Sequence, residues 1–348
     1  MRITAVGNSV FYHHPKNVAC NNKALMSAPK SLGADIFCFK GNNSLAEKIS
    51  IIPSSNQTPL EKSIEKELGV SATKTEIKKF ANGETYINID GRVRGKDVYL
   101  MPSSNPNVND NLMETYLKAD AAKRAGAKQV IAVIPNFDYA RQERKTKAGE
   151  PIAARLNMDL LKASGVDEVI TTDLHAPAIE GFASNQMKVT HLNSTELMGD
   201  YIKSKNISDL VIVSPDMGGA KRAEKLADTL CCDKAVIHKK RQAHNEATAV
   251  FFVGDVEGKN CVIYDDIIDT AGTIAEAARM LKQQGAKDIY VCAAHGLFNG
   301  KAIERLNDAP IKEIIVTNST THKKDLGDKF KEVDLASQIS KTILDISA

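Results

Sequence analysis

The stretch NCVIYDDIIDTAGTIAEAARMLKQQGAKDIYVCAAHG, residues 260–296, decides the fold. It begins with an apolar run, continues through three aspartates and a turn of small residues, and leads into a helical pattern over 273–285. A second apolar run follows at 288–296, so two buried strands enclose one helix. Two such strands form a parallel βαβ unit, because parallel neighbours need a crossover connection.

The same alternation extends over most of the 348 residues. Parallel strands are buried on both faces and therefore read as continuous apolar runs, with helices connecting them. Gly69 and Gly126 fit helix C-termini, and Asn109 or Asp110 fits the N-cap of the longest helix. The pattern predicts an α/β protein with mostly parallel central sheets. Its predicted strands cover 48–53, 129–135, 168–175, 210–216, 260–266 and 288–296, and its helices cover 59–69, 109–126, 219–230 and 273–285.

An internal echo indicates two similar halves. KRAGAKQVIAVIP at 123–135 and KQQGAKDIYVCAAHG at 282–296 share a helix end, a Gly-Ala-Lys triplet and a buried strand. This is typical of internal duplication, and the chain is long enough for two domains. No low-complexity linker separates the halves, so we expect them to pack tightly.

Residues 1–47 differ from the rest of the chain. No acidic residue precedes Asp35, although Arg2 and three lysines do. This bias resembles a transit peptide, but the single arginine and the lack of an amphipathic period argue against one. We therefore expect an N-terminal extension that is poorly ordered.

Composition narrows the class of protein. Hydrophobic residues make up 43% and charged residues 26%, as in soluble globular proteins. The net charge of +3 is too small to predict a nucleic-acid partner, and no apolar run reaches the length of about 20 residues that spans a membrane. The six cysteines lack metal-type spacing, and Cys261 and Cys292 lie in apolar runs as buried thiols do. We expect a cytoplasmic protein.

Polar residues follow the apolar runs directly. In open α/β sheets, ligands bind beyond the carboxyl ends of the strands. Asp265 and Asp266 end the strand at 260–266, His175 ends the strand at 168–175, and Asp216 ends the strand at 210–216. NFDYARQERK follows 129–135, and the basic run 239–241 follows another apolar run. We expect these residues to meet at one edge of each sheet.

The turn from Asp269 to Thr273 opens a helix. Helix N-termini carry free N–H groups and the positive end of the helix dipole, which favour a phosphate, and small residues let the backbone approach it. The neighbouring carboxylates suit the hydroxyls of a phosphorylated sugar, whereas the nucleotide pattern Gly-x4-Gly-Lys-Ser/Thr is absent from the sequence. A plain strand, turn and helix with Asp269 or Thr270 as N-cap remains an equal alternative for such a turn taken alone.

The stretch VIYDDIIDTAGT at 262–273 is similar to the 5-phosphoribosyl 1-diphosphate (PRPP) binding motif, which phosphoribosyltransferases and PRPP synthetases share. Other blocks resemble ribose-phosphate pyrophosphokinase, and the resemblance covers the chain from about residue 48 onward. In family order these blocks are KKFANGE (78–84), VRGKDVYL (93–100), NDNLMETYLKADAAKRAGA (109–127), NFDYARQERK (136–145), TTDLHAPAIEGFA (171–183) and SPDMGGAKRA (214–223).

This resemblance implies two phosphoribosyltransferase-like, Rossmann-like domains, at 48–192 and 193–333, with a C-terminal helix at 334–348 completing the first. It implies transfer of the diphosphoryl group of ATP to the anomeric hydroxyl of ribose 5-phosphate, giving PRPP and AMP, with Mg²⁺ as cofactor. It also implies a homo-oligomer, a hexamer in the family, without a nucleic-acid or membrane partner.

The resemblance also assigns roles to residues. Taken singly, a histidine ending a strand, a basic run and a strand-edge aromatic more often serve packing or solvation. Imidazole is an unusual Mg²⁺ ligand, so His175 also receives a nucleotide role. The assignments are ribose 5-phosphate to Asp265, Asp266, Asp269, Thr270, Ala271, Gly272, Thr273 and Arg241, ATP to Phe80, Asn82, Gly83, Glu84, Arg141, Gln142 and His175, metal to His175 and Asp216, and catalysis to Lys239 and Arg241.

Two alternatives remain beside this one. A phosphoribosyltransferase that consumes PRPP would share the 262–273 motif but would not need the ATP block at 80–84. A non-catalytic regulatory subunit would share the fold but lose the catalytic loops, which this chain retains. Ala148 and Gly149 stand where the family usually carries Ser-Arg, so the resemblance does not extend family regulation by phosphate and nucleoside diphosphates to this chain.

Overall fold

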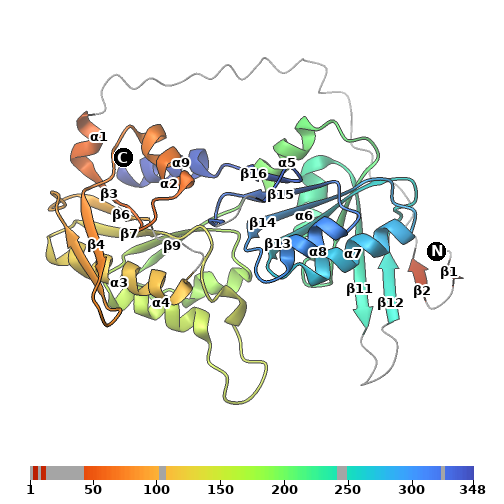
Figure 1. Cartoon of the computed structure of the whole chain (residues 1–348), viewed down its shortest axis with the longest axis horizontal. Coiled ribbons are helices and arrows are strands. Elements are labelled where there is room, and N and C mark those ends of the chain that lie inside the picture. Colours follow the sequence, from red (N-terminus) through yellow and green to blue (C-terminus); the bar gives the residue numbers. More distant parts are fainter. Residues whose placement is uncertain (1–2, 7–8, 13–42, 102–106, 241–248, 323–325) are drawn as a thin grey trace.

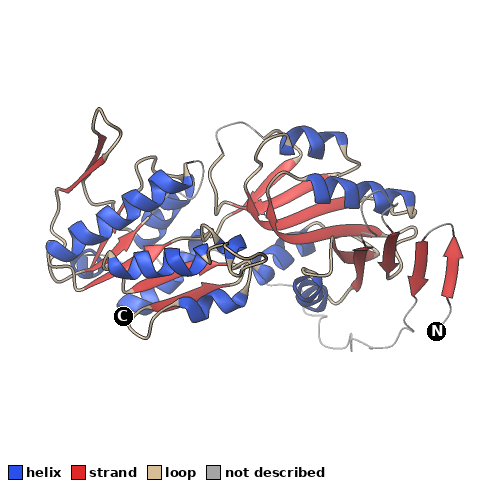
Figure 2. Ribbon diagram, turned by 90° about the horizontal axis from the view of Figure 1, so that it is seen from below, coloured by secondary structure: helices blue, strands red, loops and turns tan. Residues whose placement is uncertain are grey.

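The computed structural model describes residues 3–6, 9–12, 43–101, 107–240, 249–322 and 326–348. These residues form two α/β halves that lie side by side, one around a five-stranded sheet and one around a nine-stranded sheet (Figure 1). Helices cover both faces of each sheet (Figure 2). The predicted α/β class is confirmed.

The first half is built on a fully parallel sheet of order β3-β6-β7-β8-β9. Its inner strands are buried along their whole length, as their apolar sequences predict. Helices α3 and α4 pack on one face, and α2 on the other. The strands are β3 (Ile49–Ile52), β6 (Asp97–Leu100), β7 (Gln129–Val133), β8 (Glu168–Thr172) and β9 (Lys188–Leu192), and the helices are α1 (Asn43–Lys48), α2 (Pro59–Leu68), α3 (Val108–Arg124) and α4 (Ala153–Ala163).

The second half is built on a sheet of order β1-β2-β12-β11-β10-β13-β14-β15-β16. The run from β11 to β16 is parallel, whereas β12 pairs antiparallel with β11 and the β1–β2 hairpin adds to β12. Its strands are β1 (Ile3–Val6), β2 (Ser9–Tyr12), β10 (Leu210–Ser214), β11 (Asp233–Lys240), β12 (Ala249–Val253), β13 (Asn260–Ile268), β14 (Ile289–Gly296), β15 (Glu313–Thr317) and β16 (Phe330–Val333).

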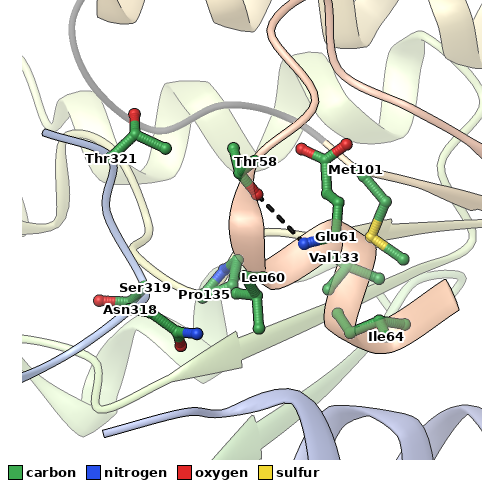
Figure 3. Close-up of a pocket in the computed structure, with 10 residues that line it drawn as sticks. All are labelled: Thr58, Leu60, Glu61, Ile64, Met101, Val133, Pro135, Asn318, Ser319 and Thr321. Atoms are coloured by element: carbon green, nitrogen blue, oxygen red, sulfur yellow. Dashed lines mark hydrogen bonds between the residues drawn. The ribbon is translucent and has the colours of Figure 1, made fainter. Parts of the chain in front are cut away.

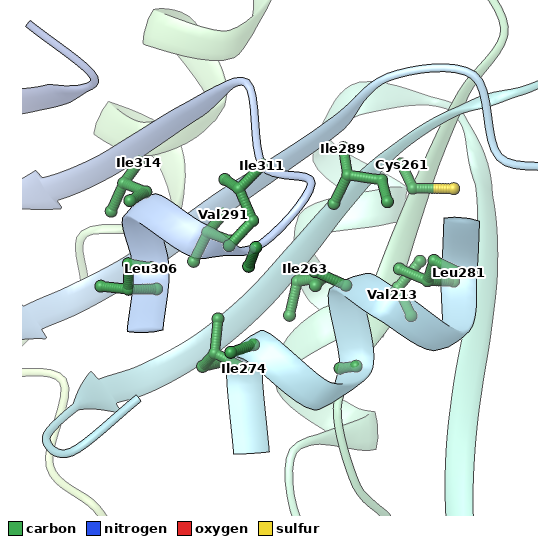
Figure 4. Close-up of a cluster of buried hydrophobic side chains, with 14 of the residues drawn as sticks. Val213, Cys261, Ile263, Ile274, Leu281, Ile289, Val291, Leu306, Ile311 and Ile314 are labelled. Atoms are coloured by element: carbon green, nitrogen blue, oxygen red, sulfur yellow. The ribbon is translucent and has the colours of Figure 1, made fainter. Parts of the chain in front are cut away.

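Helices α7 (Gly272–Gln283) and α8 (Ala302–Asp308) cover one face of this sheet, while α5 (Thr195–Ser204) and α6 (Ala220–Leu230) cover the other. Ile274 and Leu281 of α7 pack on Ile263 and Val291 of the central strands (Figure 4). All four side chains are almost fully buried. This core fixes the start of α7 against the end of β13, which is where the predicted phosphate turn lies.

The C-terminal helix α9 (Ala336–Ser347) returns to the first half and lies beside α2 (Figure 1). Ile339 and Ile343 pack into the core of the first sheet. The buried Tyr99 Oη of β6 lies 2.7 Å from Ser347 Oγ and donates to Ile343 O at 3.3 Å. Helix α9 therefore stabilises the half that is built on the five-stranded sheet.

A hairpin that the sequence analysis did not predict projects from the first half. Its strands, β4 (Thr75–Lys79) and β5 (Thr85–Ile89), form a separate antiparallel pair. Figure 1 shows β4 at the end of the molecule remote from the nine-stranded sheet. Both strands alternate between exposed and half-buried residues, so the continuous apolar run that marked the other strands is missing.

Several predicted boundaries were wrong. The strand at 168–175 ends at Thr172, because Asp173 adopts a left-handed φ of 44° that breaks the extended backbone. Helix α3 begins after Asn107 rather than at Asn109 or Asp110. Strand β13 runs on to Ile268, two residues past its predicted end. Helix α7 has Ala271 as N-cap, in place of Asp269 or Thr270.

Candidate active site

A polar pocket opens at the carboxyl ends of β10 and β13, where the two halves meet. Most of the residues predicted from the sequence to bind ligands line this pocket, although they come from separate segments spread over positions 141 to 273. They are Arg141, His175, Asp216, Asp265, Asp266, Asp269, Thr270, Ala271, Gly272 and Thr273.

Asp265 and Asp266, which are neighbours on β13, lie at the centre of a hydrogen-bond network in this pocket. Asp266 is buried, and its Oδ2 lies 2.6 Å from His175 Nδ1, which comes from the first half. Arg222 of α6 donates from Nη1 to Asp266 Oδ1 at 3.2 Å and to Asp265 Oδ1 at 3.4 Å. Asp265 Oδ1 also accepts from the backbone N–H of Asp266 at 2.9 Å. One guanidinium thus orients both carboxylates.

These contacts separate the pKa values of the two aspartates. Burial raises the pKa of Asp265, and the neighbouring Asp266 raises it further. Burial also acts to raise the pKa of Asp266, but the hydrogen bond with His175 and the charge of Arg222 outweigh it and hold this pKa below its ordinary value. The hydrogen bond to Asp266 in turn raises the pKa of His175. The site therefore stabilises an ionised Asp266 beside a more readily protonated Asp265.

The turn between β13 and α7 is held in a fixed shape. Ala271 adopts a left-handed φ of 58°, which starts the helix abruptly. Asn299 donates from Nδ2 to Asp269 Oδ1 at 2.9 Å, and Arg305 donates from Nη1 to Thr270 O at 2.7 Å. The first backbone N–H groups of α7 have no intrahelical acceptor, so a turn of this shape presents donors to an anion.

A second ion pair joins the halves at the pocket surface. Arg141 lies in a short 3₁₀ helix (Ala140–Gln142) of the first half, and its Nη1 donates to Asp269 Oδ2 at 2.6 Å. Because the arginine side chain is 57% exposed, this ion pair is worth little for stability. The arginine is therefore available to exchange its carboxylate partner for a bound anion.

Asp216 lies at the other side of the pocket, in the loop between β10 and α6. Its side chain is exposed, and its Oδ1 accepts from Gly219 N–H at 2.9 Å. A Cβ on Gly219 would lie 2.8 Å from Ser214 Oγ, so the tight loop that presents this carboxylate needs glycine at this position.

The ATP block of the sequence analysis lies elsewhere in the chain. Phe80, Asn82, Gly83 and Glu84 belong to the β4–β5 hairpin and do not line the pocket. Phe80 is 55% exposed and packs edge-on against Tyr86, with ring centroids 5.9 Å apart. The structure therefore does not bring this block together with the pocket within one chain.

Three residues with predicted roles remain, and the structure places two of them. Gln142 is exposed at the end of the 3₁₀ helix that carries Arg141, and it does not line the pocket. Lys239 lies in β11, where it pairs with Val250 of β12. Arg241 falls outside the described residues.

Three residues that organise the pocket were missed from the sequence: Arg222, Asn299 and Arg305. Arg222 lay within the quoted block 214–223, but nothing in its spacing indicates that it reaches β13. Asn299 and Arg305 follow the next strand of the sheet, about 30 residues beyond the turn that they hold. Only the parallel order of β13 and β14 brings them back to it.

A second hollow lies on the seam between the halves. Leu60, Glu61 and Val133 of the first half face Asn318 and Ser319 of the second (Figure 3). Thr58 caps α2 there by accepting from Glu61 N–H at 3.2 Å. This hollow contains none of the residues assigned to a substrate.

Together, the fold and the pocket define an α/β protein of the phosphoribosyltransferase type. Two family models match the chain, the N-terminal domain of ribose phosphate pyrophosphokinase at residues 36–165 and the phosphoribosyl synthetase-associated domain at 242–348. The chain belongs to the ribose-phosphate pyrophosphokinase family. The first match begins inside segment 1–47, so the expectation that the family resemblance starts near residue 48 was wrong.

Relatives match over most of their length. The ribose-phosphate pyrophosphokinase of Bacillus subtilis is 42% identical over 305 residues, covering 87% of this chain and 96% of the relative. That of Clostridium acetobutylicum is 40% identical over 316 residues, covering 89% and 94%. The crystal structure of phosphoribosylpyrophosphate synthetase from Mycobacterium smegmatis has a TM-score of 0.80 at 37% identity and covers 86% of this chain and 98% of that one.

Within the described part of the chain, no three histidine, cysteine or acidic side chains gather as a metal-binding cluster. Among the same residues, no helix has the length and apolar character needed to cross a bilayer.

Proposed function

We propose that this protein carries out the reaction for which its family is named. It transfers the diphosphoryl group of ATP to the anomeric hydroxyl of ribose 5-phosphate and releases PRPP and AMP. The observation that carries this proposal is the pocket itself, in which a turn at a helix N-terminus and two carboxylates of one half face Arg141 and His175 of the other. Family membership supports the same reaction over a phosphoribosyltransferase that consumes PRPP.

Ribose 5-phosphate would bind to the second half. Its phosphate fits the turn from Asp269 to Thr273, where backbone N–H groups and the α7 dipole favour a dianion. Its hydroxyls would donate to Asp265 and Asp266, which are held in place by Arg222 at 3.4 and 3.2 Å. This arrangement leaves the anomeric hydroxyl facing the first half.

ATP would bind across the pocket from the sugar. Arg141 and His175 already reach carboxylates of the second half, so the phosphate chain of ATP meets both halves at once. The anomeric hydroxyl oxygen attacks the β-phosphorus and releases its proton to solvent, the bond from this phosphorus to the α-phosphate oxygen breaks, and AMP leaves with that oxygen. Such transfers depend on positioning and charge neutralisation. Lys239 and Arg241 would supply positive charge to the transferred group.

We propose Mg²⁺ as the required ion, with Asp216 as its first protein ligand and His175 beside it. Mg²⁺ prefers oxygen ligands and usually keeps several waters, using one or two carboxylates together with substrate phosphates. The described residues fit this mode, because Asp216 is exposed to the pocket and no ready cage of three ligands surrounds it. The ion would neutralise the phosphates of ATP during transfer.

We further propose that the chain works as a homo-oligomer. The exposed Phe80 and the residues 82–84 lie on a hairpin that does not line its own pocket. In an assembly this hairpin would contribute its ATP-binding residues to the pocket of another copy. Size-exclusion chromatography with light scattering tests the assembly. Mixing a Phe80→Ala chain with a chain inactive at Lys239 then tests whether the two variants complement each other.

Two proposals concern organisation and location. We propose domains at 48–192 and 193–333, with residues 334–348 completing the first, because α9 packs on the first sheet. We also propose a cytoplasmic location, because the cysteines at 231, 232, 261 and 292 are free thiols and such thiols persist in reducing compartments.

The decisive experiment is an assay with ATP, ribose 5-phosphate and Mg²⁺, in which AMP and PRPP are measured together. We expect equal amounts of both products, loss of both in Lys239→Ala, and no product when ribose 5-phosphate is omitted. A wild-type protein that forms no AMP would contradict the proposed function and favour the regulatory-subunit alternative.

A further inference from the structure

A fully buried imidazole joins the two halves behind the pocket. His295 ends β14 of the second half, and its side chain is 2% exposed. Its Nε2 lies 3.1 Å from Thr172 O of β8, and its Nδ1 lies 2.8 Å from Ser319 Oγ. A carbonyl oxygen only accepts, so Nε2 must carry the proton. Nδ1 of the neutral ring then faces the serine hydroxyl as an acceptor, and the same hydroxyl lies 3.3 Å from Ala294 O.

The carbonyl of Thr172 is the last of β8, and His175 lies three residues further on. Between them, the backbone N–H of Leu174 donates to Nε2 of His191 on β9 at 2.9 Å, and Asp173 Oδ2 accepts from Ser194 N–H at 3.0 Å. His191 holds the loop from the first half, whereas Ser194, which precedes α5, holds it from the second half. His295 adds a further contact from the second half, at the last carbonyl of β8.

The same imidazole is tied to the strand that carries the carboxylates. In the register of β13 and β14, His295 stands opposite Ile267, directly after Asp266. A single side chain therefore connects the strand of Asp266 to the strand that leads to His175. It spans the two halves where no solvent competes for the hydrogen bond.

Two links between the halves that lie in the pocket are of a different kind. His175 with Asp266, and Arg141 with Asp269, lie in the pocket and consist of the groups that would bind substrates. A bound phosphate or metal ion competes for these groups, so these links can open during turnover. The buried bond from His295 to Thr172 O has no such competitor and can remain closed throughout.

We infer that His295 is a positioning residue that holds the loop carrying His175 in register with the carboxylates of β13. The inference deepens the proposed function, since it rests on His175 contacting the nucleotide or its ion. His295 itself does not line the pocket and touches no substrate. Its contribution is the fixed spacing between two groups that act on the same transferred diphosphoryl group.

The test compares His295→Leu, which removes both hydrogen bonds, with His295→Gln, whose amide nitrogen can still donate toward Thr172 O. Thr115→Val is the matched control, because Thr115 Oγ1 donates to Asn111 O at 2.8 Å in a buried part of α3, within one half and apart from the contacts of His295. Each variant is examined by hydrogen exchange of residues 172–176, and by kcat and KM for both substrates. If His295→Leu does not fold, His295→Asn replaces it, being too short to reach Thr172 O.

We expect His295→Leu to lower kcat about tenfold or more while leaving the KM for ribose 5-phosphate close to that of the wild type, since small displacements of catalytic groups are costly. Exchange of residues 172–176 should rise about tenfold, reporting local opening of this loop. His295→Gln should recover most of both losses, and Thr115→Val should show neither.

Unchanged exchange and unchanged kcat in His295→Leu would overturn the inference. So would equal losses in His295→Leu and His295→Gln, because the donor to Thr172 O would then be irrelevant. The exchange measurement needs no turnover. It therefore separates failure of this inference from failure of the proposed function, which would show as a wild-type protein that makes no AMP.

Discussion

Arg222 offers the sharpest test of how the pocket is organised. Its guanidinium contacts both Asp265, at 3.4 Å, and Asp266, at 3.2 Å. Arg222→Met keeps a long apolar side chain at this position of α6 but leaves two adjacent, largely buried carboxylates without their shared donor. Their mutual repulsion would then act on the strand end that is proposed to bind the sugar hydroxyls.

The expected loss in the free energy of unfolding follows from how far the ion pair is buried. Hydrogen bonds to charged groups contribute about 1.5–3 kcal/mol, and breaking a fully buried pair costs about 3–5 kcal/mol. The side chains of Arg222 and Asp265 are 23% and 21% exposed, so the lower range applies. A loss of about 1.5–3 kcal/mol corresponds to a fall in Tm of about 3–12 °C for domains of this size.

Calorimetric titration with ribose 5-phosphate measures the binding effect, and thermal unfolding measures the stability effect. We expect ribose 5-phosphate to bind about tenfold more weakly, which is about 1.4 kcal/mol. Arg124→Met is the control, since Arg124 pairs with Asp120 on an exposed helix face and should change neither quantity. If Arg222→Met bound ribose 5-phosphate as the wild type does and kept its Tm, the proposed orientation of the carboxylates by Arg222 would be refuted.

Three further outcomes are expected. Arg305→Met loses the 2.7 Å bond to Thr270 O, and the resulting looser turn should raise the KM for ribose 5-phosphate by several-fold with little change in Tm. Burial lowers the pKa of His295, so at a pH below the ordinary histidine pKa of about 6.5 the unfolded chain binds more protons than the folded one. The free energy of unfolding should therefore fall as the pH drops below that value, by at most about 1.4 kcal/mol per pH unit. Urea unfolding of His295→Gln at a series of pH values should show a shallower fall. Tyr99→Phe removes the contact with Ser347 and should lower stability by about 1 kcal/mol, and limited proteolysis should then release α9 sooner than in the wild type.

The sequence predicted those elements of the fold that depend only on the residues within each element. The strands that became β7, β10 and β14 are buried on both faces, so their apolar runs were sufficient to predict them. The β4–β5 hairpin has no such run, because its side chains are never fully covered. The order of the strands, which brings Asn299 and Arg305 to the turn, is a long-range property that no local pattern contains.

The site shows the same division. The turn at 269–273 could be located because its small residues stand between an apolar run and a helical pattern, although that pattern alone left a plain N-capped turn as an equal alternative. The partner of His175 could not, since His175 and Asp266 lie in different halves and 91 residues apart. Arg222 gave no signal either, because a basic residue on a helix is usually solvated and only the packing of α6 against β13 directs it inward.

The duplicated architecture explains why the pocket lies between the halves rather than within one. Each half offers a carboxyl edge of parallel strands, yet the two edges differ in chemistry. The acidic pair lies near the end of β13 and the turn at 269–273 follows it, whereas the segment between β6 and α3 reads MPSSNPN at 101–107 and has no acidic residue. The first half lacks such carboxylates after β6 and instead contributes Arg141 and His175 to the edge of the second. The two halves thus present complementary surfaces, one with carboxylates and one with basic side chains. In the proposed reaction the first surface would bind the sugar and the second would neutralise the phosphate chain of ATP, so the transfer would use both.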